Sequence, residues 1–202
     1  MYRILAFTGA GISKASGIPT FEDMGNIREK LSRDYFNENT EDFYQVLMEM
    51  KKVCQIAQPN PAHLALARYD VPVITMNIDG LHKRAGSKNV LEIHGSLDYV
   101  HCESCKKQYD YSVLNRTLYC DTCHKKLQPN VVLYGDNIPL YAQASKMIMD
   151  AKEVLVVGTS FVTSTSWIFT DMAKARGTKV TLINDNAEAK VQKYLQGIFD
   201  KE

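Results

Sequence analysis

Four cysteines in the middle of the chain form two close pairs, Cys102/Cys105 and Cys120/Cys123. Each Cys-x-x-Cys pair can supply two thiolate ligands from one tight turn, and two such pairs complete the tetrahedral shell of one zinc ion. Fourteen residues (106–119) separate the pairs, close to the spacing of zinc ribbons. Four protein thiolates leave no open coordination position, so the spacing predicts a structural zinc site rather than a catalytic one.

Two disulfides are the alternative use of the same four thiols. Disulfides are rare in cytosolic proteins, and the chain starts at Met1 without a signal-peptide pattern. We therefore expect zinc and a cytoplasmic location. The fifth cysteine, Cys54, lies in an apolar helical pattern and is expected to be a buried structural thiol.

A glycine-rich segment near the start of the chain could bind phosphate groups. Gly9-Ala10-Gly11-Ile12-Ser13 directly follows a short apolar run. A strand followed by Gly-x-Gly and a helix start places backbone N–H groups where a pyrophosphate can lie. Lys14 replaces the third glycine of the dinucleotide fingerprint, so a plain structural turn explains this segment about equally well.

Asn77, Asp79 and His94 follow two further apolar runs. Ligands of open α/β sheets bind at the carboxyl ends of the strands, so these side chains are expected to meet in one crevice with the glycine-rich segment. An imidazole there is suited to act as a general base near neutral pH. Taken singly, each residue also has a structural interpretation, since Asn-x-Asp-Gly is a common turn sequence.

These residues require a scaffold of alternating strands and helices. Apolar, β-branched runs predict buried strands at 3–7, 71–76, 90–94, 131–134, 154–157 and 180–183. Amphipathic patterns predict helices at 41–57, 140–151, 167–176 and 187–195. This alternation predicts an α/β fold, with a Rossmann-like parallel sheet covered by helices on both faces.

Two segments interrupt the alternation. Residues 98–130 are polar, aromatic and cysteine-rich, and we expect them to form a small zinc-ribbon-like module. Residues 20–60 contain no clear strand and are expected to form a helical insert of the main domain. The Rossmann-like domain would then comprise residues 1–97 and 131–202.

The composition is that of an ordinary globular protein. The chain has 202 residues, of which 45% are hydrophobic and 23% charged, with a net charge of +1. A balanced charge gives no reason to expect nucleic acid as a partner. No apolar stretch approaches the ~20 residues that a membrane-spanning helix needs. The oligomeric state is left open.

In combination, these segments closely resemble the sirtuin family of NAD-dependent protein-lysine deacylases, over nearly the whole chain. The matching motifs, in chain order, are Gly9-Ala10-Gly11-Ile12-Ser13, Ser16-Gly17-Ile18-Pro19-x-Phe21, Pro59-Asn60-x-Ala62-His63, Asn77-Ile78-Asp79-Gly80-Leu81-His82, Glu92-x-His94-Gly95-Ser96, the four cysteines, Pro129-x-Val131-Val132, Gly158-Thr159-Ser160 and Ile183-Asn184. The resemblance implies NAD and zinc as cofactors and an acyl-lysine protein or peptide as substrate. It also implies release of nicotinamide and O-acyl-ADP-ribose by a compact member of the family.

The resemblance also implies roles for single residues. His94 matches the base that removes a ribose hydroxyl proton, Asp79 the residue that captures the nicotinamide carboxamide, and Asn77 the one that orients ribose and water. The other residues matched to cofactor binding are Gly9, Ala10 and Ser13 at the phosphates, Phe21 over the ribose, Ile78 between Asn77 and Asp79 in the sequence, and Gly158, Thr159, Ser160 and Asn184 at the adenosine half.

Substrate binding is implied for Val131, Val132 and Tyr134, which resemble the stretch where an acyl-lysine peptide adds as a strand. Tyr44 matches a tyrosine that works with an arginine three positions later in desuccinylating relatives, and that position is Leu47 here. Without a guanidinium to bind an acidic acyl group, neutral acyl chains are expected. An ordinary amphipathic helix is the alternative explanation of this pair.

Two departures from the family leave the activity open. Glu22 stands where the family usually has arginine, and Met76 where it usually has glutamine, so binding of NAD could be weakened. Arg28 could supply the missing charge, or could be a solvated helix arginine. The first alternative function is a mono-ADP-ribosyltransferase or NAD glycohydrolase, which would use the same cleavage of NAD differently. The second, which the two departures motivate, is a non-catalytic NAD-binding module.

Overall fold

A five-stranded parallel sheet forms the centre of the larger part of the molecule. The computed structural model describes residues 1–20, 23, 25, 27–159 and 164–200. The strands of the sheet are β1 (Leu5–Thr8), β2 (Val73–Thr75), β3 (Val90–Glu92), β7 (Glu153–Val157) and β8 (Lys179–Ile183). Their order across the sheet is β3-β2-β1-β7-β8, and all neighbours are parallel. The predicted Rossmann-like sheet is confirmed.

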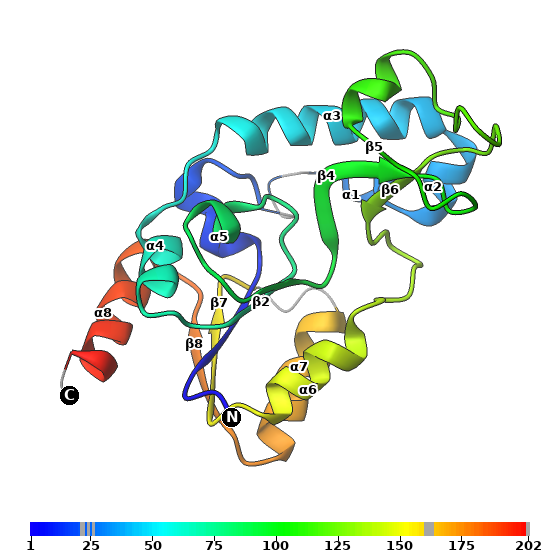
Figure 1. Cartoon of the computed structure of the whole chain (residues 1–202). Coiled ribbons are helices and arrows are strands. Elements are labelled where there is room, and N and C mark those ends of the chain that lie inside the picture. The colour runs from blue at the N-terminus through cyan, green and yellow to red at the C-terminus, as the bar shows by residue number, and fades with distance from the viewer. Residues whose placement is uncertain (21–22, 24, 26, 160–163, 201–202) are drawn as a thin grey trace.

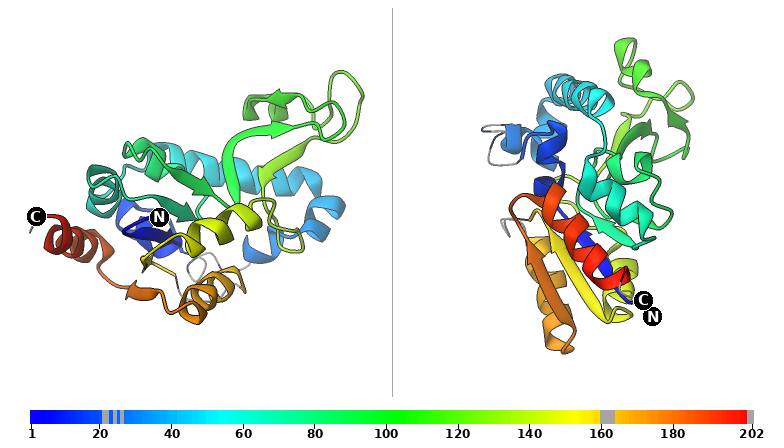
Figure 2. Two further views of the ribbon diagram at one scale, coloured as in Figure 1. Left: turned by 60° about the horizontal axis from the view of Figure 1, so that its bottom comes forward. Right: turned by 90° about the vertical axis from the view of Figure 1, so that its left-hand side faces the viewer.

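Helices cover both faces of this sheet because its central strands are apolar on both sides. Along β1, Ala6 packs with α4 (Pro61–Arg68) and α8 (Ala187–Phe199), whereas Leu5 and Phe7 pack with α6 (Tyr141–Met149) and α7 (Ser164–Ala175). Successive side chains of a strand point to opposite faces, which explains this division. Figures 1 and 2 show α8 on one side of β7 and β8, with α6 and α7 on the other.

A second sheet, of three antiparallel strands, lies beside the first. It contains β4 (Gly95–His101), β5 (Gln108–Tyr109) and β6 (Gln128–Val131) in the order β5-β4-β6. The prediction of a strand of the parallel sheet at residues 131–134 was therefore wrong. Val131 ends β6 and pairs with Gly95 of β4.

The helices of the 20–60 segment pack on this smaller sheet. They are α1 (Ile27–Lys30), α2 (Arg33–Glu38) and α3 (Thr40–Ile56). Phe36, Phe43 and Leu47 share one hydrophobic core with Val100 and Leu127. Figure 1 shows α2 and α3 together with β4, β5 and β6, away from β7 and β8. The segment expected as an insert of the main domain thus contributes its apolar face to the core around the cysteines.

The remaining helical segments are short connections. They are η1 (Ala10–Ser16) after β1, α5 (Leu81–Arg84) after β2, and η2 (Tyr111–Asn115) within the cysteine-rich module. The four predicted long helices are present as α3, α6, α7 and α8, with ends displaced by a few residues. Across the described residues, none of the helices combines the length and apolarity needed to cross a membrane.

Candidate active site

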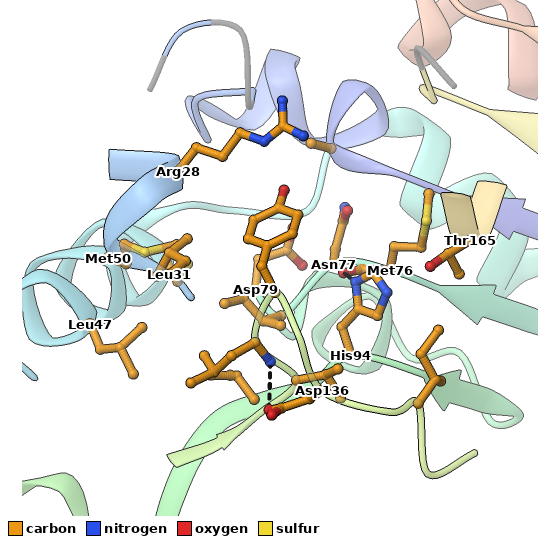
Figure 3. A pocket seen from close by; sticks show the side chains of 18 of the residues that line it. Arg28, Leu31, Leu47, Met50, Met76, Asn77, Asp79, His94, Asp136 and Thr165 are labelled. Carbon is orange, nitrogen blue, oxygen red and sulfur yellow. Dashed lines mark hydrogen bonds between the residues drawn. The ribbon is translucent and has the colours of Figure 1, made fainter. Parts of the chain in front are cut away.

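A cavity of about 370 Å³ lies where the carboxyl ends of β1, β2 and β3 face the smaller sheet. Ala10 follows β1, Asn77 and Asp79 follow β2, and His94 follows β3. The structure therefore brings together the side chains that the sequence placed at strand ends (Figure 3). The described residues that line the cavity are Ala10, Ile18, Pro19, Arg28, Leu31, Leu47, Met50, Cys54, Met76, Asn77, Ile78, Asp79, His94, Val131, Val132, Leu133, Tyr134, Gly135, Asp136, Ile138 and Thr165.

The glycine-rich segment approaches the end of β7 backbone to backbone. A Cβ atom added to Gly11 would lie 2.7 Å from the Cα atom of Gly158, which no side chain tolerates. Gly158 itself has a φ of +64°, a conformation that L side chains rarely adopt. Glycine at both positions lets the two segments meet, and this fixes the position of Ala10 at the cavity.

His94 lies at the cavity with one ring nitrogen occupied. Its Nδ1 atom is 3.1 Å from the carbonyl oxygen of Met76. A carbonyl can only accept, so Nδ1 carries the hydrogen and Nε2 keeps a lone pair. Burial lowers the pKa of His94 from its ordinary value, an effect that the bond to Met76 partly offsets. The imidazole is thus neutral at pH 7 and able to accept a proton.

Asp79 and Asn77 are held by one buried hydroxyl group. Ser13 Oγ donates to Asp79 Oδ2 at 2.7 Å and accepts from Asn77 Nδ2 at 3.1 Å. The other oxygen of Asp79 accepts the Leu81 N–H at 2.9 Å, and Asn77 Nδ2 also donates to the Gly9 carbonyl. Among the described residues, Asn77 Oδ1 has no partner and stays available as an acceptor. Ser13 itself is fully buried and does not line the cavity.

Two buried histidines behind this network belong to the matching motifs, but the sequence assigned them no role. His63 Nδ1 accepts the Asn60 N–H at 3.3 Å, and His63 Nε2 lies 3.4 Å from Ser13 Oγ. The His63 and His82 rings pack edge to face with centroids 4.8 Å apart. Burial lowers the pKa of His63 to about 4 and that of His82 well below its ordinary value. The available signal was the segment from Pro59 to His63, whose Asn60 caps α4.

The segment expected to bind the peptide forms one wall of the cavity. Val131, Val132 and Tyr134 all line it. The Val132 N–H donates to the His94 carbonyl at 2.9 Å, and the Tyr134 N–H donates to the Leu31 carbonyl at 3.1 Å. These bonds tie the wall to the histidine segment on one side and to the helical segment on the other.

Tyr44 does not reach the cavity, although the sequence placed it at the substrate. It is 1% exposed and its hydroxyl donates to the Leu127 carbonyl at 2.7 Å, inside the core of the smaller sheet. Leu47 lines the cavity instead, with Met50 and Cys54 from the same helix. This part of the cavity is apolar.

Cys54 is less buried than the buried structural thiol that the sequence predicts. It is half-buried and its side chain faces the apolar part of the cavity. Burial raises the pKa of its thiol to about 11, so it is protonated and unreactive at pH 7.

The residues matched to the adenosine half lie at the ends of β7 and β8. Asn184 Oδ1 accepts the Thr159 N–H at 3.0 Å, and Asn184 Nδ2 donates to the Thr159 carbonyl at 2.7 Å. This pair of bonds fixes the backbone directly after Gly158. Phe21, Glu22 and Ser160 lie outside the described residues.

The four cysteines of the module come together as a metal site would require. Their sulfur atoms all lie within 4.8 Å of one another, and each pair is followed by a residue with positive φ, Lys106 at +58° and His124 at +56°. The two turns have the same backbone hydrogen bond: the N–H of the first cysteine of each pair donates to the carbonyl oxygen of the residue five positions later.

The donor set fits zinc rather than disulfides. Backbone N–H groups of Cys105 and Thr122 point at the sulfur atoms of Cys102 and Cys120, each at 3.4 Å, which stabilises thiolates. The Cys102 and Cys123 sulfur atoms are 3.4 Å apart, beyond the ~2.05 Å of a disulfide bond. Four thiolates in a closed shell give a structural zinc site.

Comparison with known proteins gives one consistent result. The Sir2 family model matches residues 9–165. An NAD-dependent protein deacetylase of Bacillus cereus is 36% identical over 207 residues, covering 95% of this chain and 84% of the relative. One from Staphylococcus aureus is 38% identical over 180 residues, covering 79% of this chain and 74% of the relative.

Solved structures agree. A Sir2 homologue in complex with NAD superimposes with a TM-score of 0.88 at 28% identity, covering 98% of this chain and 90% of the other. A Sir2 enzyme bound to a propionylated peptide superimposes with a TM-score of 0.84 at 30% identity, covering 98% and 92%.

Proposed function

This chain belongs to the Sir2 family, and from that premise we propose how its own residues carry out NAD-dependent deacylation of protein lysines. The chain is an NAD-dependent protein deacylase that uses NAD and a structural zinc ion. The observation that supports the roles below is the shared cavity, in which a neutral histidine at the end of β3 meets an amide oxygen and a carboxylate at the end of β2.

The groups at the cavity fit NAD. Asn77 Oδ1 and His94 Nε2 have no partner among the described residues, and the segment at Ala10 approaches the cavity with its backbone. When bound, NAD would supply a ribose carbon that the acyl oxygen can attack as nicotinamide leaves, and a neighbouring ribose hydroxyl that finally carries the acyl group. The protein has to bind the two substrates side by side, keep water away and move one proton.

His94 is the general base in this proposal. Its Nε2 lone pair accepts the proton of a ribose hydroxyl, and the bond from Nδ1–H to Met76 stabilises the imidazolium that forms. The positive charge appears only during the step, because burial keeps the resting ring neutral. The fixed tautomer means that no ring flip is needed before proton transfer.

Asp79 and Asn77 orient the cofactor. Ser13 and the Leu81 N–H hold the Asp79 carboxylate in one orientation, so it can accept the N–H groups of a carboxamide. Asn77 directs Oδ1 to hydroxyl groups or water, since both of its N–H groups are bound to protein. Positioning of this kind is a large part of the rate enhancement of two-substrate reactions.

The acyl-lysine substrate enters along the wall formed by Val131, Val132 and Tyr134. An extended peptide can pair with backbone groups there, and its lysine stem can lie against apolar side chains. The acyl group then extends towards Leu31, Leu47 and Met50, which among the described residues form an apolar end of the cavity without a cation. This end of the cavity therefore favours neutral acyl groups over acidic ones.

The direct test mixes the purified protein with NAD and an acetyl-lysine peptide and follows the peptide by mass spectrometry. Loss of the acetyl group that requires NAD supports the proposed function. Turnover of NAD with an unchanged peptide would contradict it, as would an unchanged peptide and unchanged NAD.

A further inference from the structure

Arg28 occupies an unusual place for a charged residue of a short surface helix. It lies on α1, whose described residues are all outside the core, yet its side chain lines the cavity. Its guanidinium carbon is 5.2 Å from the centre of the Tyr134 ring, within the range of a cation–π contact. The contact holds an otherwise flexible side chain over the cavity (Figure 3).

No carboxylate of the described residues pairs with Arg28. The two acidic side chains among the described residues of the lining already have partners. Asp136 accepts two bonds from Arg33, each at 2.8 Å, and Asp79 accepts from Ser13 and from the Leu81 N–H. Arg28 is thus the one cationic side chain among the described residues of the lining, and its charge is not neutralised there.

The other basic residue of α1 shows the contrast. Lys30 forms an ion pair with Asp42 of α3 at 2.8 Å and does not line the cavity. One turn of helix therefore presents two cations in different directions, one bound to the protein and one facing the cavity.

We propose that Arg28 binds the pyrophosphate of NAD, an inference that rests on the proposed function. The planar guanidinium fork can bind two phosphate oxygens at once. Ala10, Ile18 and Pro19, of the glycine-rich segment and the residues after it, line the same cavity as Arg28. In Figure 3 the guanidinium group points away from Leu47 and Met50, so the acyl end of the cavity is not its target.

The test compares binding of two ligands by isothermal titration calorimetry. ADP-ribose carries the pyrophosphate, and nicotinamide riboside does not. Arg28→Met keeps most of the apolar stem, and we expect it to weaken ADP-ribose binding by about 10- to 100-fold, the range for loss of a charge-assisted hydrogen bond. Binding of nicotinamide riboside should be unchanged. The affinity of Arg28→Lys for ADP-ribose should lie between those of the wild type and Arg28→Met, because lysine keeps the charge and lacks the guanidinium fork.

Lys30→Met is the matched control, since it removes the same charge from the same helix. It should bind ADP-ribose like the wild type. If Lys30→Met weakened ADP-ribose binding as much as Arg28→Met does, the proposal would be overturned. The loss would then follow from removing any positive charge from α1, not from a contact of Arg28. Wild-type affinity in Arg28→Met would overturn it directly.

A third arm separates the cofactor from the acyl group. If Arg28→Met binds ADP-ribose normally but loses activity only on succinyl-lysine peptide, Arg28 binds the acyl carboxylate and the proposal is wrong. If the wild-type protein binds no ADP-ribose, both the proposed function and the proposal about Arg28 are wrong. Weakened binding of ADP-ribose together with intact binding of nicotinamide riboside is the result that supports the proposal.

Discussion

His94 donates its Nδ1–H to the carbonyl oxygen of Met76 at 3.1 Å, across the ends of two neighbouring strands. The bond fixes the tautomer, and burial lowers the pKa of the ring below the ordinary 6.5. A base acts only when neutral, so kcat/KM should be constant near pH 7 and fall as the pH drops through this lowered value. A pH profile between about 4.5 and 8 checks this. A fall that begins above pH 7 would contradict the assignment.

The zinc site should be needed for the fold of the smaller sheet. Cys102 and Cys120 are fully buried in the core that α2 and α3 share with this sheet, so metal removal should loosen that core. Elemental analysis should find one zinc per chain, and Cys102→Ala should lose the metal and unfold at lower temperature. Cys54→Ala is the control for loss of a thiol and should keep its zinc. A zinc-free protein of wild-type stability would contradict this prediction.

The apolar side chain of Leu47 should determine which acyl groups the enzyme prefers. Leu47, Met50 and Leu31 form an apolar end of the cavity, where a carboxylate would lose water without gaining a partner. We expect acetyl or longer neutral acyl-lysine to be preferred over succinyl-lysine by roughly 30-fold, corresponding to ~2 kcal/mol. Competition between peptides of one sequence measures the ratio.

Leu47→Arg provides the matching gain of function. It places a guanidinium at the apolar end and should raise activity on succinyl-lysine while lowering that on long neutral chains. Faster removal of succinyl by the wild-type protein would show that the apolar end does not hold the acyl group.

The buried histidine pair should make the protein sensitive to acid. Burial lowers the pKa of His63 to about 4, so between the ordinary 6.5 and this value the unfolded chain binds a proton that the folded chain does not. Stability should therefore fall as the pH drops through this window, by about 2 kcal/mol between pH 6.5 and 5 from His63. Urea unfolding at pH 7 and pH 5 measures the loss.

His63→Gln removes this titration while keeping an N–H group that can reach Ser13. The variant should lose less stability than the wild type between pH 7 and pH 5, although it is less stable at pH 7. Equal losses in the two proteins would show that His63 does not titrate in this window.

The parallel sheet could be predicted from the sequence because its strands are continuous apolar runs. The same rule failed at residues 131–134, because a short apolar run does not distinguish a strand of a parallel sheet from one of an antiparallel sheet. Pairing of Val131 with Gly95 depends on where β4 runs, which no local pattern encodes. Motif order was sufficient to place Asn77, Asp79 and His94 at one cavity.

Side-chain direction was harder to predict than position. Tyr44 and Leu47 are three residues apart on α3, and helical periodicity puts them on neighbouring faces without saying which one meets the cavity. The contact between Ser13 and His63 joins residues 50 positions apart and depends on how α4 packs against η1. Burial of His82 beside His63 likewise follows from packing.

The central claim is that this protein transfers an acyl group from lysine to NAD with His94 as the base. Mass spectrometry of the products formed from NAD and an acetyl-lysine peptide tests it most directly, with wild-type protein and His94→Ala side by side. We expect O-acetyl-ADP-ribose and nicotinamide from the wild type and a loss of about 100-fold or more in His94→Ala, which should still bind NAD. Free ADP-ribose without deacetylated peptide, an ADP-ribosylated protein, or near wild-type product formation by His94→Ala would contradict it.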